Sequence, residues 1–221
     1  KTHIFLTTCR NYILEHLKLQ NQKAIQFNLQ ENTNHLFQFK NGAFNLKTGK
    51  LEKRTKEMYI TETLDYDYSP EEDEEAKETI LSIIKQILPK QWETHLKWRG
   101  YCLTGETKEQ IFILNIGYTA DNGKSFLSKI FRNSFPLYCD KLGNDAFDKN
   151  NSGYNKCFSP LMNKPIRMVY MEEWGKKEQD INLIKATVEG ETLTVKPLYY
   201  EEQIIAIQFK LEAASNNDPN A

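Results

Sequence analysis

The sequence predicts an α/β fold, and three observations support this class. Residues 111–116 form a short apolar run typical of a buried strand, and residues 126–131 have the apolar spacing of a helix. A polar loop with two glycines joins these two segments. Further along, a β-type run at residues 166–171 is followed by helical spacing at residues 180–188. Strand and helix patterns that alternate in this way are typical of α/β proteins.

The loop between the first strand and its helix has the composition of a phosphate-binding loop. Its candidate residues are Gly117, Asp121, Asn122, Gly123, Lys124 and Ser125. Backbone N–H groups can converge on phosphate oxygens only where glycine leaves the approach open, and the following helix adds its positive N-terminal end. In such a loop Lys124 would contact the β- and γ-phosphates, and the Ser125 hydroxyl would be a ligand of Mg²⁺.

The spacing of this loop departs from the usual pattern at one position. The common pattern places a glycine at position 118, but this chain has Tyr118 there and Gly117 one place earlier. Either the loop holds one extra residue or it does without that glycine. A tight strand-to-helix turn with an exposed lysine is the alternative interpretation, and it does not account for residues 121–125 taken together.

Acidic and amide side chains follow two other apolar runs. Hydrolysis of a phosphate needs a carboxylate in the Mg²⁺ shell and a base that orients the attacking water. Glu172 is assigned to the metal shell and Glu173 to the water, and the reverse assignment stays open. Asn216 follows a later apolar run, where its amide would hydrogen-bond the γ-phosphate or the water. The alternatives are a solvent-exposed turn for the two glutamates and ordinary turn chemistry for the asparagine.

Four segments occur in an order that resembles a known family. They are residues 122–125, residues 169–173, residues 185–191 with 196–199, and residues 209–219. In this order they are similar to the Walker A, Walker B, B′ and C motifs of the superfamily 3 helicase domain, which occurs in poxvirus-type primase-helicases of large DNA viruses and some phages. Upstream, residues 39–49 and 98–105 are similar to the segment that precedes the ATPase in that family.

The resemblance implies a P-loop NTPase with an AAA+-like, three-layer αβα core that is truncated at its C-terminal end. It implies ATP and Mg²⁺ as cofactors, a hexamer of this chain, and a single DNA strand in the central channel of the ring. The B′ hairpin of such rings carries lysines toward the channel, so Lys196 and Lys185 are candidate DNA contacts. A solvated lysine is the alternative for both. A primase domain or a polymerase is a further expected partner.

Three departures from the family limit this interpretation. The loop glycine is displaced, Glu191 stands where many relatives have Asp, and the chain stops soon after Asn216. The family's arginine finger and its last core elements would lie beyond Ala221. We therefore expect this chain not to complete an intersubunit site by itself.

The chain divides into three expected regions. Residues 1–76 are a β-rich accessory region, residues 77–106 a helical linker or collar, and residues 107–221 the incomplete ATPase core. The acidic segment at residues 65–76 is expected to be an exposed connector that leads into the first turn of a helix.

Short-range patterns predict the elements of the accessory region. Residues 10–20 have helical spacing, and an Asn-Gly turn between residues 36–39 and 43–46 predicts a β-hairpin. A second turn at residues 47–50 leads into residues 58–61, so that the segment forms a small antiparallel β unit.

The other predicted elements follow in order. Apolar residues recur at helical spacing over residues 80–88 until Pro89 stops them, and a second helical run begins at Trp92. Trp92 and Trp98 are expected to be core anchors. Residues 136–165 show little periodicity and are expected to be loop-rich. A helix over residues 180–188, with Asp180 as N-cap and Gly190 near its end, precedes a hairpin that pairs residues 192–196 with 203–209.

Composition and charge narrow the class of protein. The chain has 221 residues, with 29 Lys and Arg against 30 Asp and Glu, and a net charge of −1. Such a balance does not indicate nucleic-acid binding, although a local basic lining would be enough for it.

The sequence shows neither an apolar run approaching eighteen residues nor a signal-peptide pattern, so no membrane span is expected. With the resemblance, this places the protein in the host cell, at a viral replication site in the cytoplasm. Lys1 in place of an initiator Met suggests a fragment.

Cysteine and histidine residues are expected to carry no chemistry. Cys9, Cys102, Cys139 and Cys157 have no paired spacing of the kind that zinc sites and disulfide frameworks show. They are predicted to be buried or idle thiols. The four histidines are far apart in the sequence and are predicted to be structural.

Two other functions stay open. A degenerate ATPase domain could serve as a scaffold that docks a primase or a polymerase clamp. A P-loop kinase would need a set of lid arginines, and Arg132 and Arg167 are the only arginines after residue 125.

Overall fold

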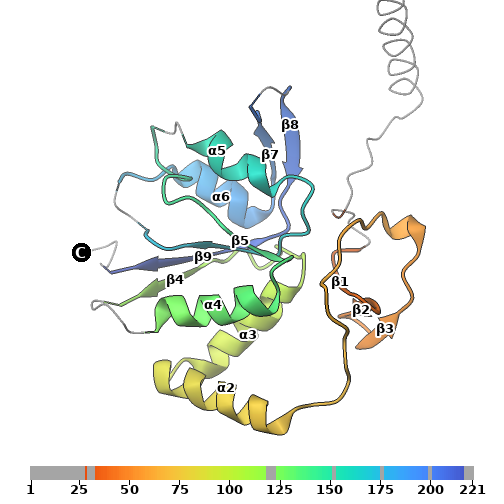
Figure 1. The fold of residues 1–221 in the computed structure, drawn as a ribbon. Helices are drawn as coiled ribbons and strands as arrows, with labels where there is room; N and C mark the ends of the chain where they lie inside the picture. Colours follow the sequence, from red (N-terminus) through yellow and green to blue (C-terminus); the bar gives the residue numbers. More distant parts are fainter. Residues whose placement is uncertain are drawn as a thin grey trace, which may run out of the picture.

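The centre of the protein is a parallel β-sheet with helices on both faces (Figure 1). The computed structural model describes residue 28 and residues 33–117, 123–150, 153–174, 177–198 and 201–216. Four strands run in the order β4-β9-β6-β5, and all neighbours are parallel. Their bounds are Ile113–Ile116 for β4, Cys139–Lys141 for β5, Met168–Met171 for β6 and Lys210–Ser215 for β9.

Five α-helices of the described residues pack on this sheet or beside it. They are α2 (Glu74–Ile87), α3 (Trp92–Leu103), α4 (Lys124–Ser134), α5 (Tyr154–Phe158) and α6 (Ile181–Glu189). Helices α3 and α4 lie on one face, with α2 outside them, and α5 and α6 lie on the other face (Figure 1). The sequence-based prediction of an α/β fold is therefore confirmed at this level.

The two central strands are buried on both faces, and β6 is almost wholly apolar, whereas β9 also carries Lys210, Glu212 and Ser215. Every residue of β6 and β9 is buried, because one layer of side chains faces α3 and α4 and the other faces α5 and α6. On the α3 side, the core includes Trp98, Phe131 and Met168. A larger core on the α6 side includes Phe158 and Ile184.

A separate antiparallel β unit precedes the helices. Its strands are β1 (Leu36–Phe39), β2 (Gly42–Asn45) and β3 (Lys50–Glu52), paired in that order. The unit packs on the segment before β5, where the rings of Phe37 and Tyr138 stack with centroids 3.9 Å apart. The Tyr138 hydroxyl also accepts a hydrogen bond from the backbone N of Gln38, at 2.6 Å.

A hairpin projects from the sheet between α6 and β9. Its strands, β7 (Thr192–Val195) and β8 (Gln203–Ala206), pair in antiparallel register. Leu193, Val195 and Ile205 are buried against the core on the α6 side. A short 3-10 helix, η2, spans Lys56–Met58, and another, η3, spans Ser159–Leu161.

Most local predictions are confirmed by the structure. The hairpin at the Asn-Gly turn forms, α2 ends two residues before Pro89, and the hairpin after Gly190 pairs as expected. Helix α6 begins after its N-cap Asp180 and ends at Gly190, whose φ is 77°. Cys102, Cys139 and Cys157 are free, buried thiols, as predicted. The helix predicted over residues 10–20 and Cys9 lie outside the described residues.

Residues 136–165 are loop-rich, as predicted, and their described part contains only the short elements β5, α5 and η3. Two predictions are wrong. Residues 58–61 are not a strand, because the turn that contains Gly49 returns the chain at once and β3 pairs with β2 in their place. Trp92 is not a core anchor but is half-buried, with the Lys85 ammonium 4.5 Å from the centroid of its ring.

No helix within the described ranges is long and apolar enough to cross a bilayer. The expected region boundaries at residues 76 and 106 stay predictions.

Candidate functional site

The predicted site residues come together at one edge of the sheet. Gly117 follows β4, the two glutamates 172 and 173 follow β6, and Asn216 follows β9. Because the strands are parallel, their carboxyl ends share this edge. The connection after β4 leads to α4 on one face, whereas the connection after β6 leads to α6 on the opposite face (Figure 1). The carboxyl ends of the strands are the edge at which open α/β sheets bind ligands.

Lys124 bridges two strands of this edge. Its ammonium donates to the carbonyl oxygen of Gly117 at 3.0 Å and to Oδ1 of Asn216 at 3.2 Å. The backbone N of Gly117 in turn donates to the carbonyl oxygen of Ser215 at 3.0 Å. The ammonium therefore lies between the beginning of the loop and the end of β9, where both of its acceptors could be exchanged for phosphate oxygens.

The loop joins its helix through a glycine that the geometry requires. Gly123 is the N-cap of α4 and has φ 80° and ψ −2°, a left-handed conformation that favours glycine. A Cβ atom at this position would lie 2.8 Å from a side-chain carbon of Ile87, so α2 packs directly against the end of the loop. The first turn of α4 contains no acidic residue, which leaves its positive end available to an anion.

The two glutamates are exposed and are held by neighbouring strands. Glu172 forms an ion pair with Lys141 at the end of β5. The backbone N of Glu173 donates to Oδ1 of Asn144 at 3.4 Å. One residue later, the backbone N of Trp174 donates to the carbonyl oxygen of Ala214 at 2.8 Å, which fixes the acidic segment to β9. Glu172 thus lies on the same edge as Lys124 but contacts a different lysine.

Tyr170 is a polar residue of this region that the sequence analysis missed. Its side chain is on β6 and is 2% exposed, and its hydroxyl makes no hydrogen bond of normal geometry to any described residue. Burial raises its pKa, and the hydroxyls of Ser125 and Ser128 lie next to it. A buried phenol at the strand before the glutamates therefore faces the first turns of α4.

These residues fit a magnesium-bound triphosphate by their chemistry. The helix end, the ammonium of Lys124 and the adjacent hydroxyl of Ser125 are the groups that phosphate loops use. No cluster of three or more His, Cys, Asp or Glu side chains in the described part of the chain could hold a metal ion alone. Mg²⁺ commonly takes one or two protein oxygens together with phosphate oxygens and waters, so Ser125 and Glu172 would suffice once Glu172 leaves Lys141. Asp121 and Asn122 lie outside the described residues.

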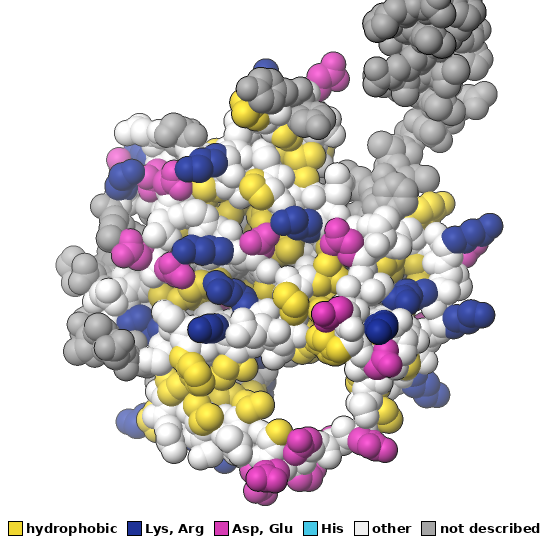
Figure 2. All heavy atoms as spheres, in the orientation of Figure 1, with side chains coloured by type: hydrophobic (Ala, Val, Ile, Leu, Met, Phe, Trp, Pro, Cys, Tyr) yellow, Lys and Arg dark blue, Asp and Glu magenta, His cyan; other side chains and the backbone are white. Residues whose placement is uncertain are grey.

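The candidate DNA contacts lie on different elements from the loop. Lys185 is exposed on α6, and Lys196 is exposed just after β7, with its backbone N donating to Oδ1 of Asn155 at 2.7 Å. Figure 2 shows lysine, arginine and acidic side chains interspersed over the face it presents, without a continuous basic surface. Any DNA contact on this face would therefore rest on a few local lysines.

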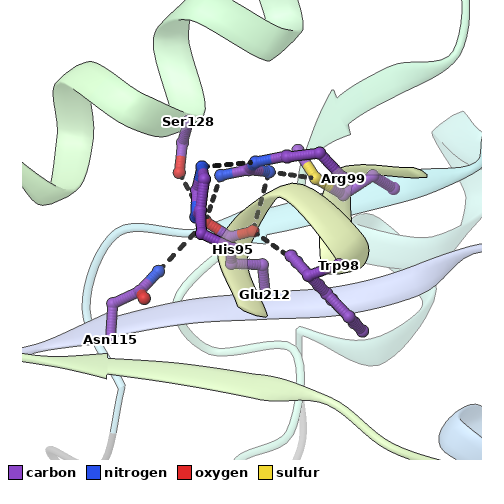
Figure 3. Close-up of polar contacts among 7 residues, drawn as sticks. His95, Trp98, Arg99, Asn115, Ser128 and Glu212 are labelled. Carbon is purple, nitrogen blue, oxygen red and sulfur yellow. Dashed lines mark hydrogen bonds and ion pairs between the residues drawn. The ribbon is translucent and has the colours of Figure 1, made fainter. Parts of the chain in front are cut away.

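A buried polar cluster lies beneath the candidate site, and sequence reasoning also missed it. Its centre is Glu212 of β9, which is 0% exposed and accepts hydrogen bonds from α3, β4 and α4 (Figure 3). The available signal was a lone acid in the apolar run that precedes Asn216. A charged residue inside a fully buried strand needs charged or hydrogen-bonding partners, and these can only come from the covering helices and the next strand.

Comparison with known proteins adds a match to the first part of the chain. Residues 10–100 match the family model described as D5 N terminal like. This D5 N terminal like segment ends before β4, so it includes the β unit and most of α3 but none of the candidate site. No curated protein matches the chain.

Solved structures of one protein are similar over part of the chain. Three structures of the NrS-1 C-terminal region, all described as apo, have 16%, 14% and 16% sequence identity to it, with TM-scores of 0.44, 0.46 and 0.46. They cover 62%, 71% and 61% of this chain, which spans 32%, 39% and 33% of theirs. The aligned part of this chain therefore spans about a third of the length of these structures.

Proposed function

We propose that this chain is part of an ATP-dependent DNA helicase module of a viral or phage replication primase-helicase, with a P-loop, AAA+-like core. The observation that carries the proposal is the position of Lys124, whose ammonium joins the start of the loop to Asn216 at the carboxyl edge of a parallel sheet. The D5 N terminal like match supports the replication role, because this model describes a segment found in phage and viral primase-helicases.

The residues at the edge have separate roles in this proposal. Lys124 exchanges its two protein acceptors for β- and γ-phosphate oxygens and stabilises the charge that develops there. Ser125 and Glu172 would hold the Mg²⁺, which would supply positive charge to neutralise the phosphates. Glu173 orients the attacking water, and Asn216 hydrogen-bonds the γ-phosphate or that water. The exposed positions of both glutamates leave them accessible to a bound nucleotide.

The proposed assembly is a hexameric ring around single-stranded DNA. Lys196, at the end of β7, is the first candidate for a contact with the DNA backbone, and Lys185 is the second. Both ammonium groups are on exposed residues, as a phosphate contact requires. A primase domain or a polymerase would be the neighbouring component of the replication machinery.

Substitution of the loop lysine tests the ATPase directly. We expect Lys124→Ala in the full-length protein to reduce Mg²⁺-dependent ATP hydrolysis at least about 100-fold, because the point charge on the phosphates is lost. Phosphate release measured at saturating ATP is the readout. Lys129→Ala is the matched control, since Lys129 is an exposed lysine of the same helix. Equal turnover in the wild type and Lys124→Ala would refute the site.

One observation favours a second candidate, a degenerate scaffold that docks other replication proteins. Glu172, the carboxylate that would hold the metal, forms an ion pair with Lys141 instead. If that pair is permanent, the wild-type protein should show no rise in melting temperature with Mg²⁺ and ATP, whereas a functional site should show one that Lys124→Ala removes.

The position of Arg167, one of the two arginines after residue 125, argues against a P-loop kinase. Arg167 is 2% exposed, and its guanidinium donates to Gln208 at 2.7 Å. It is held beneath the β unit and cannot act as a lid residue.

A further inference from the structure

The carboxylate of Glu212 is contacted by five donor atoms from α3, β4 and α4, and Figure 3 shows how these side chains surround it. Oε1 accepts from Nη2 of Arg99 at 2.9 Å, from Nδ2 of Asn115 at 3.0 Å and from Oγ of Ser128 at 2.7 Å. Oε2 accepts from Nε1 of Trp98 at 2.9 Å and pairs with Nη1 of Arg99 at 2.8 Å. The pair is the two-point contact between guanidinium and carboxylate that fixes orientation as well as distance.

Two of these donors lie beside the phosphate loop, one on each side of it. Asn115 is on β4, two residues before Gly117. Ser128 is in α4, one helical turn after Lys124. A single carboxylate therefore ties the strand that enters the loop to the helix that leaves it.

Glu212 also belongs to the strand that leads into Asn216, the acceptor of the loop lysine. It lies four residues before Asn216 on β9, and every residue between them is buried. A shift of Glu212 would therefore move both acceptors of Lys124 relative to its ammonium. The carboxylate of Glu212 therefore links β4, α4 and β9, the three elements that form the site.

Arg99 connects the Glu212 carboxylate to α3, which lies outside the sheet. Its Nε donates to Nε2 of His95 at 3.2 Å, and its Nη1 contacts Sδ of Met168 at 2.9 Å. Burial lowers the pKa of His95 to about 4, so the imidazole is neutral and accepts this bond. The guanidinium is thus held in one orientation by α3 and β6 while it holds Glu212.

Stability alone does not explain a buried ion pair at this place. An apolar pair of similar volume would commonly serve the fold at least as well, because both charges lose their hydration. A fully satisfied buried network does give one defined arrangement of the elements that carry it. The pair lies where β4, α4 and β9, which carry the candidate site residues, meet α3. A fixed arrangement of these elements would hold the site residues in the positions that catalysis needs.

We propose that Glu212 is a positioning residue of the nucleotide site and that Arg99 makes α3 part of the support of the phosphate loop. The proposal rests on the proposed ATPase function. Through Asn115 and Ser128, the carboxylate sets the spacing between the loop and the end of β9, and this spacing places Lys124 against Asn216. Loss of the two-point contact lets α3 and the loop move independently.

The test uses two mild variants of the full-length protein. Arg99→Lys keeps the positive charge but cannot make the two-point contact with the Glu212 carboxylate. Ser128→Ala removes the hydroxyl that α4 donates to this carboxylate. Lys97→Gln is the control, because Lys97 is an exposed residue of the same helix α3. ATP turnover is measured at a temperature where circular dichroism shows every variant fully folded.

We expect kcat to fall about 10- to 100-fold in Arg99→Lys, with KM changed less than about threefold, because misplacement affects the transition state more than binding. Ser128→Ala is expected to show a smaller fall. The effects of the two substitutions should not add in the double variant, since both act through Glu212. A purely structural role would lower the melting temperature but leave kcat of the folded variants equal to that of Lys97→Gln.

Hydrogen exchange separates this proposal from the proposed function. The Gly117 amide, which donates to Ser215, should exchange about tenfold faster in Arg99→Lys without nucleotide, while the Ile184 amide of α6 keeps its wild-type rate. Unchanged exchange and unchanged kcat in an active protein would overturn the positioning role. Faster exchange in a protein that neither binds nor hydrolyses ATP would overturn the ATPase and leave the positioning role in place.

Discussion

Lys210 shows how burial sets the chemistry of a single residue. Its side chain is 3% exposed, donates to the carbonyl oxygen of Thr104 and lies 4.8 Å from the centroid of the Tyr101 ring. No carboxylate within the described ranges forms an ion pair with it. Because burial penalises the charged ammonium, the pKa of Lys210 falls to about 7.

This depressed pKa predicts a pH-dependent stability. Between about pH 7 and pH 10 the unfolded state keeps a proton on Lys210 that the folded state has released. The free energy of unfolding therefore increases as the pH rises through this range. Relative to Lys210→Met, the free energy of unfolding of the wild type should rise by about 3–4 kcal/mol over this range. Urea unfolding of both proteins at each pH measures the difference. The buried thiols are common to both proteins, so a difference that stays flat with pH would contradict the prediction.

At the scale of elements, α6 shows how local chemistry defines a helix. Asp180 accepts hydrogen bonds from the backbone N of Asn182 at 3.0 Å and of Leu183 at 3.1 Å. Gly190 ends the helix in a left-handed conformation. Both ends were predictable because the residues that cap a helix are its neighbours in the sequence.

The N-cap contribution can be measured by one substitution. Asp180→Ala should lower the free energy of unfolding by about 1 kcal/mol, because two backbone donors lose their acceptor. Glu189→Ala is the control, since Glu189 is an exposed residue at the other end of the same helix. Chemical denaturation monitored by circular dichroism gives both values, and equal stabilities would show that the cap contributes nothing.

The elements that the sequence did not predict are those decided by distant partners. Strand β5 has three residues and no periodicity of its own, and it forms only because Cys139–Lys141 pair with β6. The same limit applies to the site. The loop and Asn216 were identifiable because each follows a recognisable apolar run. Glu212 was not, because its partner Trp98 is 114 residues away in the chain.

At the scale of the whole molecule, the β unit and the sheet are joined by an aromatic contact and by backbone hydrogen bonds. Phe37 stacks on Tyr138 and meets Phe135 edge-on, with centroids 5.1 Å apart. Near the end of α3, the backbone N of Gly105 donates to the carbonyl oxygen of Asn34 at 2.7 Å. We therefore expect the unit and the sheet to unfold together.

Removal of the stacked ring tests this joint. Phe37→Ala should lower the free energy of unfolding by about 3–4 kcal/mol, because a buried ring is replaced by a cavity. Leu51→Ala should change it by less than about 1 kcal/mol, since Leu51 is an exposed residue of the same β unit. Thermal unfolding followed by tyrosine fluorescence and by far-ultraviolet circular dichroism should give coincident transitions in the wild type. Separate transitions would show that the two parts are independent.

The central place of β9 has a consequence for synthesis of the protein. β9 pairs with β4 on one side and β6 on the other, yet the ribosome makes it after both. Until residue 215 has emerged, the two earlier strands lack their common neighbour and present unpaired apolar edges. We therefore expect the nascent chain to stay open to chaperones until β9 inserts between its two neighbours.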